Sequence, residues 1–292
     1  MQISVCPVCS SSKSKEVYPD ELNGLAPSVD YAFSPITRLT FRIVECLACE
    51  HQFVNPVPDL NGLYEENEDP IYLASNHQRI LSARSWMKIV AKHSANARRL
   101  IDVGCATGVF LDEAAKSMDV SGIELSRWSG DIASQNHEVF RHPVSQLTVE
   151  SRYDVATLWG VIEHLDNPAS EVRAIRQILN DRGLLFVYTG DRSAWLPKIL
   201  GKKWWWYQGM HIQYFTKSSL TRLLVENGFE IIGSDQLPIY FSLHSIGQSM
   251  NRYKLAKPLV WLFQNSPVKN IVVRLKLSGE MLLIARCADN SS

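Results

Sequence analysis

The sequence predicts an α/β protein in which a doubly wound, mostly parallel sheet follows a small amino-terminal module. Three observations support this prediction. From residue 99 onward, apolar segments of strand length alternate with amphipathic segments of helical length, a pattern typical of parallel sheets covered on both faces. The turn Asp102-Val-Gly-Cys-Ala-Thr-Gly108 follows one such strand and precedes a helix. Two C-x2-C pairs, Cys6/Cys9 and Cys46/Cys49, precede the alternating region.

Length and composition are those of an ordinary globular chain. The 292 residues are 46% hydrophobic and 21% charged, and the net charge is zero, which gives no support for a nucleic-acid-binding protein. The charge is unevenly distributed, because residues 1–70 are acidic and residues 192–278 are basic. We see no secretory signal and no apolar run of the roughly 18–20 residues that span a membrane, so we expect a cytoplasmic protein with reduced cysteines.

The two C-x2-C pairs predict a metal site. Cys6, Cys9, Cys46 and Cys49 offer four thiolates from two tight turns, which suits tetrahedral Zn²⁺. Alternating apolar residues at 39–45 predict a strand that leads into the second pair. Four unrelated thiols or a redox motif are the alternatives, and the latter is disfavoured because no thioredoxin-like βαβ pattern accompanies the pairs.

We assign residues 1–60 to this zinc-ribbon-like module. The module either replaces a core too small to fold alone or recognises substrate, and its acidic surplus argues against contact with nucleic acid. His51 lies close to the second pair, but four cysteines already fill the coordination shell, so we expect a surface histidine. Residues 61–97 are predicted to hold the end of a turn-rich linker (54–75) and an amphipathic helix from about 78 to 94.

The central region is predicted from its alternating pattern. We expect strands at 99–103, 119–124, 137–141, 153–159 and 183–189, and helices at 109–117, 128–136 and 168–180. Asn167 and Pro168 provide an N-cap and a first helical residue for the last of these helices. Ligands of such sheets bind outside the carboxyl ends of the strands, so the turns there are the candidate site.

The first of these turns discriminates between cofactors. A dinucleotide fingerprint requires glycine at 104, 106 and 109, but the chain has Gly104, Ala106 and Val109, which disfavours NAD and FAD. A P-loop sequence is also missing. The remaining candidate is a nucleoside cofactor without a pyrophosphate. Glu124, which ends the second strand, can accept hydrogen bonds from both ribose hydroxyls, and the alternative is a solvated acid at the end of a strand.

These residues carry a family resemblance. The turn at 102–108, Gly122-Ile-Glu-Leu-Ser126 and the segment 153–168 with its Glu163-His164 pair resemble the motifs of class I S-adenosylmethionine-dependent methyltransferases. The resemblance implies a Rossmann-like sheet of seven strands, with the sixth at 228–232 and an antiparallel last strand at 279–286. It also implies an S-adenosylmethionine-binding core at 98–240 and a region 241–292 that holds a basic insertion and the last strand. The cysteine module is similar to that of zinc-bearing members, which include sugar C-methyltransferases.

The resemblance also implies roles for individual residues. Asp102 would support the turn and the amino group of the cofactor, Glu124 would hold the ribose, and Leu125 would lie beside the adenine. Four residues of the turn would line the methionine part of the cofactor: Gly104, Cys105, Ala106 and Gly108. Two residues at the end of the fourth strand, Trp159 and Gly160, would border the sulfonium. Ala106 departs from the family pattern, which has a glycine there, and His142-Pro143-Val144-Ser145 lacks the acid that often meets the adenine.

Two histidines are candidate catalytic bases. Methyl transfer to an oxygen or carbon acceptor requires removal of a proton near neutral pH. His164 follows the fourth strand and His211 follows the fifth, and the alternative for each is hydrogen bonding that anchors a loop. The aromatic residues at 202–207 predict either acceptor stacking, contact with a membrane interface, or cover for the edge of the sheet. The basic, acid-free residues 249–276 permit peripheral membrane contact, although packing onto the domain or a second subunit is favoured.

The predicted function is transfer of a methyl group from S-adenosylmethionine to a small-molecule acceptor. A sugar or a surface-polysaccharide precursor is one candidate acceptor. Two alternatives remain open. RNA methylation is disfavoured by the acidic amino-terminal module, and a zinc-bearing binding protein with a degenerate methyltransferase fold would not bind the cofactor. The sequence does not distinguish O-, N- and C-methylation, and it does not indicate the oligomeric state.

Overall fold

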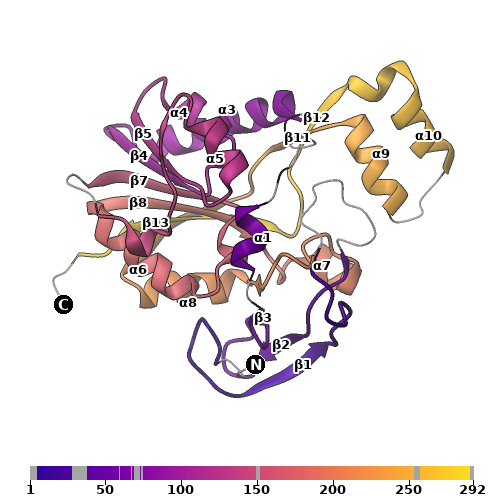
Figure 1. Ribbon diagram of the computed structural model, residues 1–292, viewed down its shortest axis with the longest axis horizontal. Coiled ribbons are helices and arrows are strands. Elements are labelled where there is room, and N and C mark those ends of the chain that lie inside the picture. Colours follow the sequence, from indigo (N-terminus) through magenta and orange to yellow (C-terminus); the bar gives the residue numbers. More distant parts are fainter. Residues whose placement is uncertain are drawn as a thin grey trace.

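The computed structural model describes residues 5–27, 38–58, 60–66, 68, 73, 75–148, 152–252 and 257–289. Its central feature is a seven-stranded sheet with helices on both faces (Figure 1). The strand order is β10-β13-β8-β7-β4-β5-β6. The bounds are β4 Arg99–Val103, β5 Asp119–Ile123, β6 Glu138–Phe140, β7 Tyr153–Trp159, β8 Leu179–Gly190, β10 Phe229–Asp235 and β13 Glu280–Cys287.

The pairing in this sheet confirms the predicted fold class. β4 is parallel to β5 and β7, and β6 and β8 extend the parallel part on either side. β13 is antiparallel to both β8 and β10, as the antiparallel last strand of the predicted fold requires. The strand order reverses at β4, so the loops after β4, β5 and β7 lie at the switch point where ligands of such sheets bind.

Two groups of helices cover the two faces of the sheet (Figure 1). α3 (Asn76–His93), α4 (Val109–Ala114) and α5 (Arg127–Ala133) lie on one face, and α6 (Pro168–Ile178) and α8 (Lys217–Glu226) lie on the other. α6 begins as predicted, because the Asn167 side chain accepts a hydrogen bond from Ser170 N at 3.1 Å and Pro168 follows. α8 begins with a capping box formed by Thr216 and Ser219.

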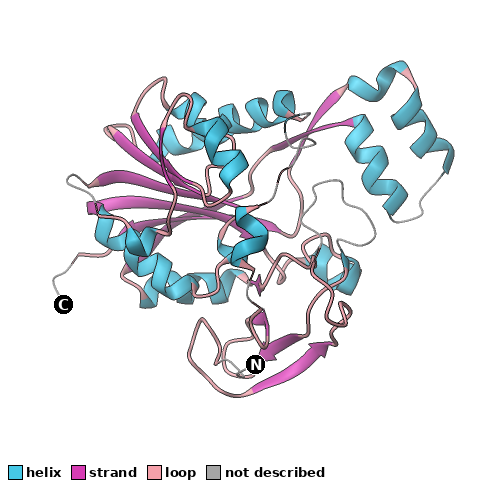
Figure 2. Ribbon diagram, viewed as in Figure 1, coloured by secondary structure: helices cyan, strands magenta, loops and turns pink. Residues whose placement is uncertain are grey.

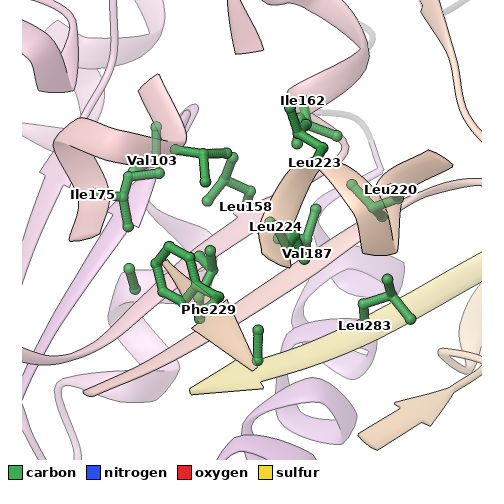
Figure 3. Packing of buried hydrophobic residues seen from close by; sticks show 14 of the residues in the cluster. Val103, Leu158, Ile162, Ile175, Val187, Leu220, Leu223, Leu224, Phe229 and Leu283 are labelled. Carbon is green, nitrogen blue, oxygen red and sulfur yellow. The ribbon is translucent and has the colours of Figure 1, made fainter. Parts of the chain in front are cut away.

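The core beneath α6 and α8 is built from aliphatic side chains of strands and helices. Figure 3 shows Leu158 of β7, Val187 of β8 and Leu283 of β13 in one cluster with three leucines of α8. All of these side chains are fully buried, and each contributes about 1.5–3 kcal/mol of burial free energy. The apolar side chains that predicted the strands therefore hold the sheet against the helices by burying apolar surface.

The amino-terminal module has its own four-stranded sheet, of order β1-β2-β3-β9. β1 is Ser14–Tyr18, β2 is Ile43–Cys46 and β3 is Gln52–Val54. The fourth strand, β9 (Gln213–Tyr214), comes from the core segment that follows β8, so the module extends beyond the predicted boundary at residue 60. This pairing protects an edge of β3 that would otherwise expose unpaired backbone groups. A short helix, α1 (Asn61–Glu65), occupies part of the predicted linker, and residues 59, 67, 69–72 and 74 of that linker lie outside the described residues.

A two-helix lobe projects from the core beside α3 (Figure 2). β11 (Ile239–Ser242) and β12 (Val272–Leu275) form an antiparallel ribbon, and between them lie α9 (Leu243–Arg252) and α10 (Lys257–Asn265). The lobe corresponds to the predicted insertion at 249–276 but begins ten residues earlier, and residues 253–256 lie outside the described residues. A separate short helix, α7 (Trp195–Leu200), follows β8. Among the described helices, none has the length and apolar character needed to cross a membrane.

Candidate functional site

The turn between β4 and α4 has three residues with left-handed backbone conformation. φ is +73° at Gly104, +48° at Ala106 and +84° at Gly108. A Cβ atom at Gly104 would lie 2.5 Å from Val161 Cγ2, so only glycine fits there. Ala106 adopts the same region despite its Cβ, at a cost of roughly 1 kcal/mol. The departure from the expected glycine pattern is therefore accommodated by the backbone.

Glu124 supports this turn from the end of β5. Its Oε2 accepts a hydrogen bond from Ala106 N at 2.8 Å, and its Oε1 accepts one from Ser126 N at 2.8 Å. Burial raises the pKa of Glu124, while these two backbone bonds oppose that change. The alternative of a solvated acid at a strand end is therefore wrong. A carboxylate has about four lone-pair sites, so acceptor capacity remains for hydroxyl donors of a ligand.

Asp102 lies beneath the turn at the end of β4. Its side chain is buried, and Oδ1 accepts a hydrogen bond from Thr157 Oγ1 of β7 at 2.6 Å. Burial raises the pKa of Asp102 to about 8. A cationic group of a ligand placed beside it would favour the ionised form. A buried carboxyl group that ionises beside a cation suits the predicted contact between Asp102 and the cofactor's amino group.

Aromatic side chains form a wall next to the turn. The Trp159 ring lies 5.1 Å from Trp86 and 5.1 Å from Phe110, measured between ring centroids. Two buried polar atoms at the site, Trp159 Nε1 and Thr107 Oγ1, have no hydrogen-bond partner among the described residues. Unpaired buried polar groups are costly, so their presence at the predicted cofactor site fits a polar ligand there.

The remaining predicted cofactor residues flank this wall. Gly160 follows Trp159 with φ of +74°, and Leu125 is 38% exposed beside Glu124. Cys105 is buried against the sheet, and its Sγ lies 2.5 Å from where a Cβ on Gly122 would stand. The structure thus brings together, at the ends of β4, β5 and β7, every residue that the sequence assigned to the cofactor.

His164 and His211 lie together although 47 positions separate them. Their rings are perpendicular, with centroids 4.8 Å apart. His164 Nδ1 lies 3.0 Å from Met210 O, and His211 Nδ1 lies 2.7 Å from Trp206 O. Because a carbonyl oxygen only accepts, Nδ1 carries the proton in each neutral ring and Nε2 carries a lone pair.

The charge state of both histidines follows from their burial. Desolvation lowers the pKa of His164 to about 4, and it lowers the pKa of His211 well below the usual value, with a further contribution from His164. Both rings are therefore neutral at neutral pH, the form that a general base requires. In both rings, Nδ1 anchors a loop by a hydrogen bond to a backbone carbonyl group. A role as a base would use the other nitrogen atom, Nε2, so loop anchoring and catalysis are compatible in the same ring.

Glu163 is a member of this cluster that the sequence analysis did not select. It is fully buried, accepts a hydrogen bond from Thr189 Oγ1 at 2.9 Å, and has a pKa raised to about 8 by burial. One ligand-type atom from each of Glu163, His164 and His211 lies within 4.8 Å of the others. Its position directly before His164 was the available signal, but the sequence does not reveal that this carboxyl group faces inward.

The four cysteines of the amino-terminal module converge as predicted. Cys6 Sγ lies 3.6 Å from Cys49 Sγ, and Cys9 Sγ lies 3.5 Å from Cys46 Sγ. All four sulfur atoms lie within 4.8 Å of one another. Zn–S bonds of about 2.3 Å in a tetrahedron place sulfur atoms about 3.8 Å apart, so this arrangement has the donor set and dimensions of a Zn²⁺ site.

The prediction of a surface position for His51 is wrong. The side chain is fully buried, its ring lies 4.6 Å from that of Phe215, and its Nε2 lies 2.9 Å from Gln213 Oε1. Gln213 Nε2 in turn donates to Leu165 O at 3.0 Å, next to His164. The prediction failed because β9, which covers this histidine, is 162 positions away in the sequence.

The module is thereby attached to the loop that carries His211. Ile212 N donates to Glu163 O at 2.9 Å, and Val54 N donates to Ile212 O at 2.9 Å. The Tyr207 hydroxyl also donates to Gln52 Oε1 at 2.6 Å. The candidate catalytic histidines therefore sit between the core sheet and the cysteine module.

The aromatic segment at 202–207 covers the end of the core sheet. Trp204, Trp206 and Tyr207 are buried, and a Cβ on Gly190 would lie 2.8 Å from the Trp206 ring. Trp205 Nε1 donates to Glu280 Oε1 at 3.1 Å. Of the interpretations considered for these side chains, cover for the sheet edge describes their position.

Comparison with known proteins places this fold in a family. The sequence profile of the methyltransferase domain family matches residues 74–233, more than half of the chain. The chain belongs to this family, and its core is that of a class I S-adenosylmethionine-dependent methyltransferase.

Individual relatives agree with this assignment at the level of the core. The ubiquinone biosynthesis O-methyltransferase of Bordetella avium is 31% identical over 131 residues, which cover 41% of this chain and 54% of that protein. The enzyme of the same name from Psychrobacter arcticus is 27% identical over 208 residues, covering 64% and 76% of the two chains. The chain thus spans about half the length of the first relative. A SAM dependent methyltransferase from Archaeoglobus fulgidus shares the fold, with a TM-score of 0.52, 12% identity, and coverage of 75% of this chain and 100% of that one.

Proposed function

We propose that this protein transfers a methyl group from S-adenosylmethionine to a hydroxyl group of a small-molecule acceptor. The observation that carries the proposal is the position of Glu124, whose carboxylate accepts hydrogen bonds from Ala106 N in the turn after β4 and from Ser126 N in the loop after β5, and keeps acceptor capacity for a ligand. The buried, unpaired Thr107 Oγ1 and Trp159 Nε1 support a polar ligand at the same turn. The donor and acceptor groups present fit the cofactor.

The chain's residues have distinct tasks in this proposal. Glu124 accepts from the ribose hydroxyls, Asp102 faces the amino group, and Gly104 allows the backbone to approach the ligand closely. Trp159, held by Trp86 and Phe110, excludes water from the reacting centre. When bound, S-adenosylmethionine supplies an electrophilic methyl group, and much of the acceleration comes from positioning the acceptor in line with it.

The neutral histidines supply the base. Their Nδ1 atoms lie against Met210 O for His164 and Trp206 O for His211, which fixes the ring orientations, and in this proposal Nε2 of His211 is the proton acceptor. We assign His211 as the base that removes the acceptor's proton and His164 as its neighbour, which lowers the pKa of His211 further. An oxygen acceptor requires this step, and general-base catalysis of this kind contributes typically 10²–10⁴-fold.

An oxygen acceptor is supported by the relatives, which are named as O-methyltransferases of ubiquinone biosynthesis. We retain a sugar or a surface-polysaccharide precursor as the acceptor class, alongside phenols. The test incubates the protein with methyl-labelled S-adenosylmethionine and separate fractions of sugar nucleotides, phenols and structured RNA. Label in a small-molecule fraction, lost in His211→Ala, is the expected result. Label in RNA alone would favour RNA methylation, and no cofactor binding by calorimetry would favour the non-catalytic alternative.

We also propose that the four cysteines bind one structural Zn²⁺. The module is a small unit built on short strands, and metal binding supplies folding free energy to such units. Metal analysis of the purified protein should find about one zinc per chain, and Cys46→Ser should lose it together with thermal stability. Cys287→Ser, which changes a buried cysteine of β13 outside the amino-terminal module, is the matched control and should keep the metal. Equal zinc content in Cys46→Ser and the natural protein would exclude the site.

A further inference from the structure

The lobe formed by β11, α9, α10 and β12 is joined to the core at its ribbon, where β11 packs on α3. Trp86 Nε1 donates to Pro238 O at 2.9 Å, and Tyr240 N donates to Ser82 Oγ at 3.2 Å. The two helices beyond the ribbon pack against each other, since a Cβ on Gly247 would lie 3.0 Å from Phe263 Cβ. The lobe therefore extends away from the methyltransferase core (Figures 1 and 2).

α10 exposes an apolar face. Its inner side packs on α9, and Val260 is its buried residue. Three other apolar side chains of α10 are exposed to solvent: Leu259 is 39% exposed, Trp261 is 63% exposed and Leu262 is 41% exposed. Each of these three residues is thus more than one third exposed in the described structure. Exposed aliphatic and tryptophan side chains that gather on one short helix indicate a surface that binds a membrane or an apolar surface of a partner.

The charge of the lobe is uniformly positive. Residues 236–279 contain six lysines and arginines and no acidic residue. Lys276 pairs with Asp235, just outside this range, at 2.9 Å, whereas Lys257 at the start of α10 and Lys269 beyond its end lie exposed. A groove of about 470 Å³ at the base of the ribbon is lined by Lys88 of α3 and by Arg274 and Lys276 of the lobe, together with Asp235.

We propose that this lobe docks on an anionic lipid surface, with the apolar face of α10 inserted among the headgroups. Tryptophan is favoured at the membrane–water interface because its ring is apolar and its N–H is polar, and the leucines beside it add buried area. The lysines around the face are attracted to lipid phosphates. A second copy of the chain is a poorer occupant because two such acid-free lobes repel each other, and a nucleic acid would leave the leucines in water.

Sedimentation with lipid vesicles tests this docking. The 292-residue protein, purified with zinc, is mixed with vesicles of phosphatidylcholine alone or of phosphatidylcholine with phosphatidylglycerol, and the bound fraction is measured at low and high salt. We expect binding to the mixed vesicles that weakens with salt. Trp261→Ala should weaken it about tenfold, and Lys257→Gln with Lys269→Gln should weaken it about fivefold per lysine.

Trp195→Ala is the matched control. Trp195 on α7 is also 63% exposed but lies outside the lobe, so its removal should leave vesicle binding unchanged. Melting curves verify that each variant is folded. The proposal is overturned if the natural protein does not sediment with the mixed vesicles, or if Trp195→Ala and Trp261→Ala have equal effects.

Two further outcomes identify a different occupant and also overturn the proposal. One is a concentration-dependent dimer that Trp261→Ala dissolves, without vesicle binding. The other is salt-dependent binding of RNA without vesicle binding. The sedimentation assay needs neither methyl donor nor acceptor, so its result is independent of the proposed methyl transfer.

Discussion

Replacement of Glu124 tests the cofactor site most directly. Glu124→Ala removes two backbone hydrogen bonds of 2.8 Å and, in our proposal, two bonds to the ribose hydroxyls. Hydrogen bonds to a charged group contribute about 1.5–3 kcal/mol each, so loss of the two ribose bonds weakens cofactor binding by about 3–6 kcal/mol. This corresponds to a dissociation constant raised about 10²–10⁴-fold. Loss of the bond to Ala106 N loosens the turn and acts in the same direction.

Calorimetric titration with S-adenosylhomocysteine measures this change. Glu124→Gln keeps one acceptor oxygen and should fall between Glu124→Ala and the natural protein. Glu113→Ala serves as the control, since Glu113 on α4 makes surface ion pairs with Arg84 and Lys116 that contribute about 0–1 kcal/mol. If Glu124→Ala binds the ligand within about threefold of the natural protein while remaining folded, the ribose assignment is wrong.

Two further predictions concern stability. Gly104→Ala combines a φ of +73° with a Cβ 2.5 Å from Val161, so we expect the free energy of unfolding measured in urea to fall by about 2–4 kcal/mol. Gly24→Ala, at a φ of +85° with no neighbour within 4 Å, is the control and should lower it by about 1 kcal/mol. Equal losses in the two variants would refute the close approach of Val161 to Gly104. Glu163 has a folded pKa of about 8 against an ordinary 4.5, so its contribution is fully present below about pH 4.5 and is lost as the pH rises to about 8. Glu163→Gln should therefore reduce the fall in melting temperature across this window, although Asp102 retains part of it, and an unchanged slope would contradict the assignment.

The positions of several helices and strands could be predicted from the local sequence. β4 and β7 occupy the residues predicted for them, and α6 begins at its predicted cap. Hydrophobic periodicity, turn residues and caps are short-range signals, so they predict where an element begins and which face is buried. The turn at Gly104, the acid at Glu124 and the cysteine pairs were found for the same reason, since each is a short motif with its own chemistry.

The environment of each side chain was decided by tertiary structure. His51 is buried because β9 pairs with β3, and Glu163 faces Thr189 inside the core because the loop after β7 folds beneath the segment that carries His211. The contact between the two candidate bases joins residues that no periodic pattern relates. Periodicity is a property of neighbours along the chain, whereas burial and proton affinity depend on groups brought together by packing. The sequence by itself therefore determined the fold and the turn that we assign to the cofactor, and only the folded chain determined how the cysteine module meets the candidate catalytic histidines.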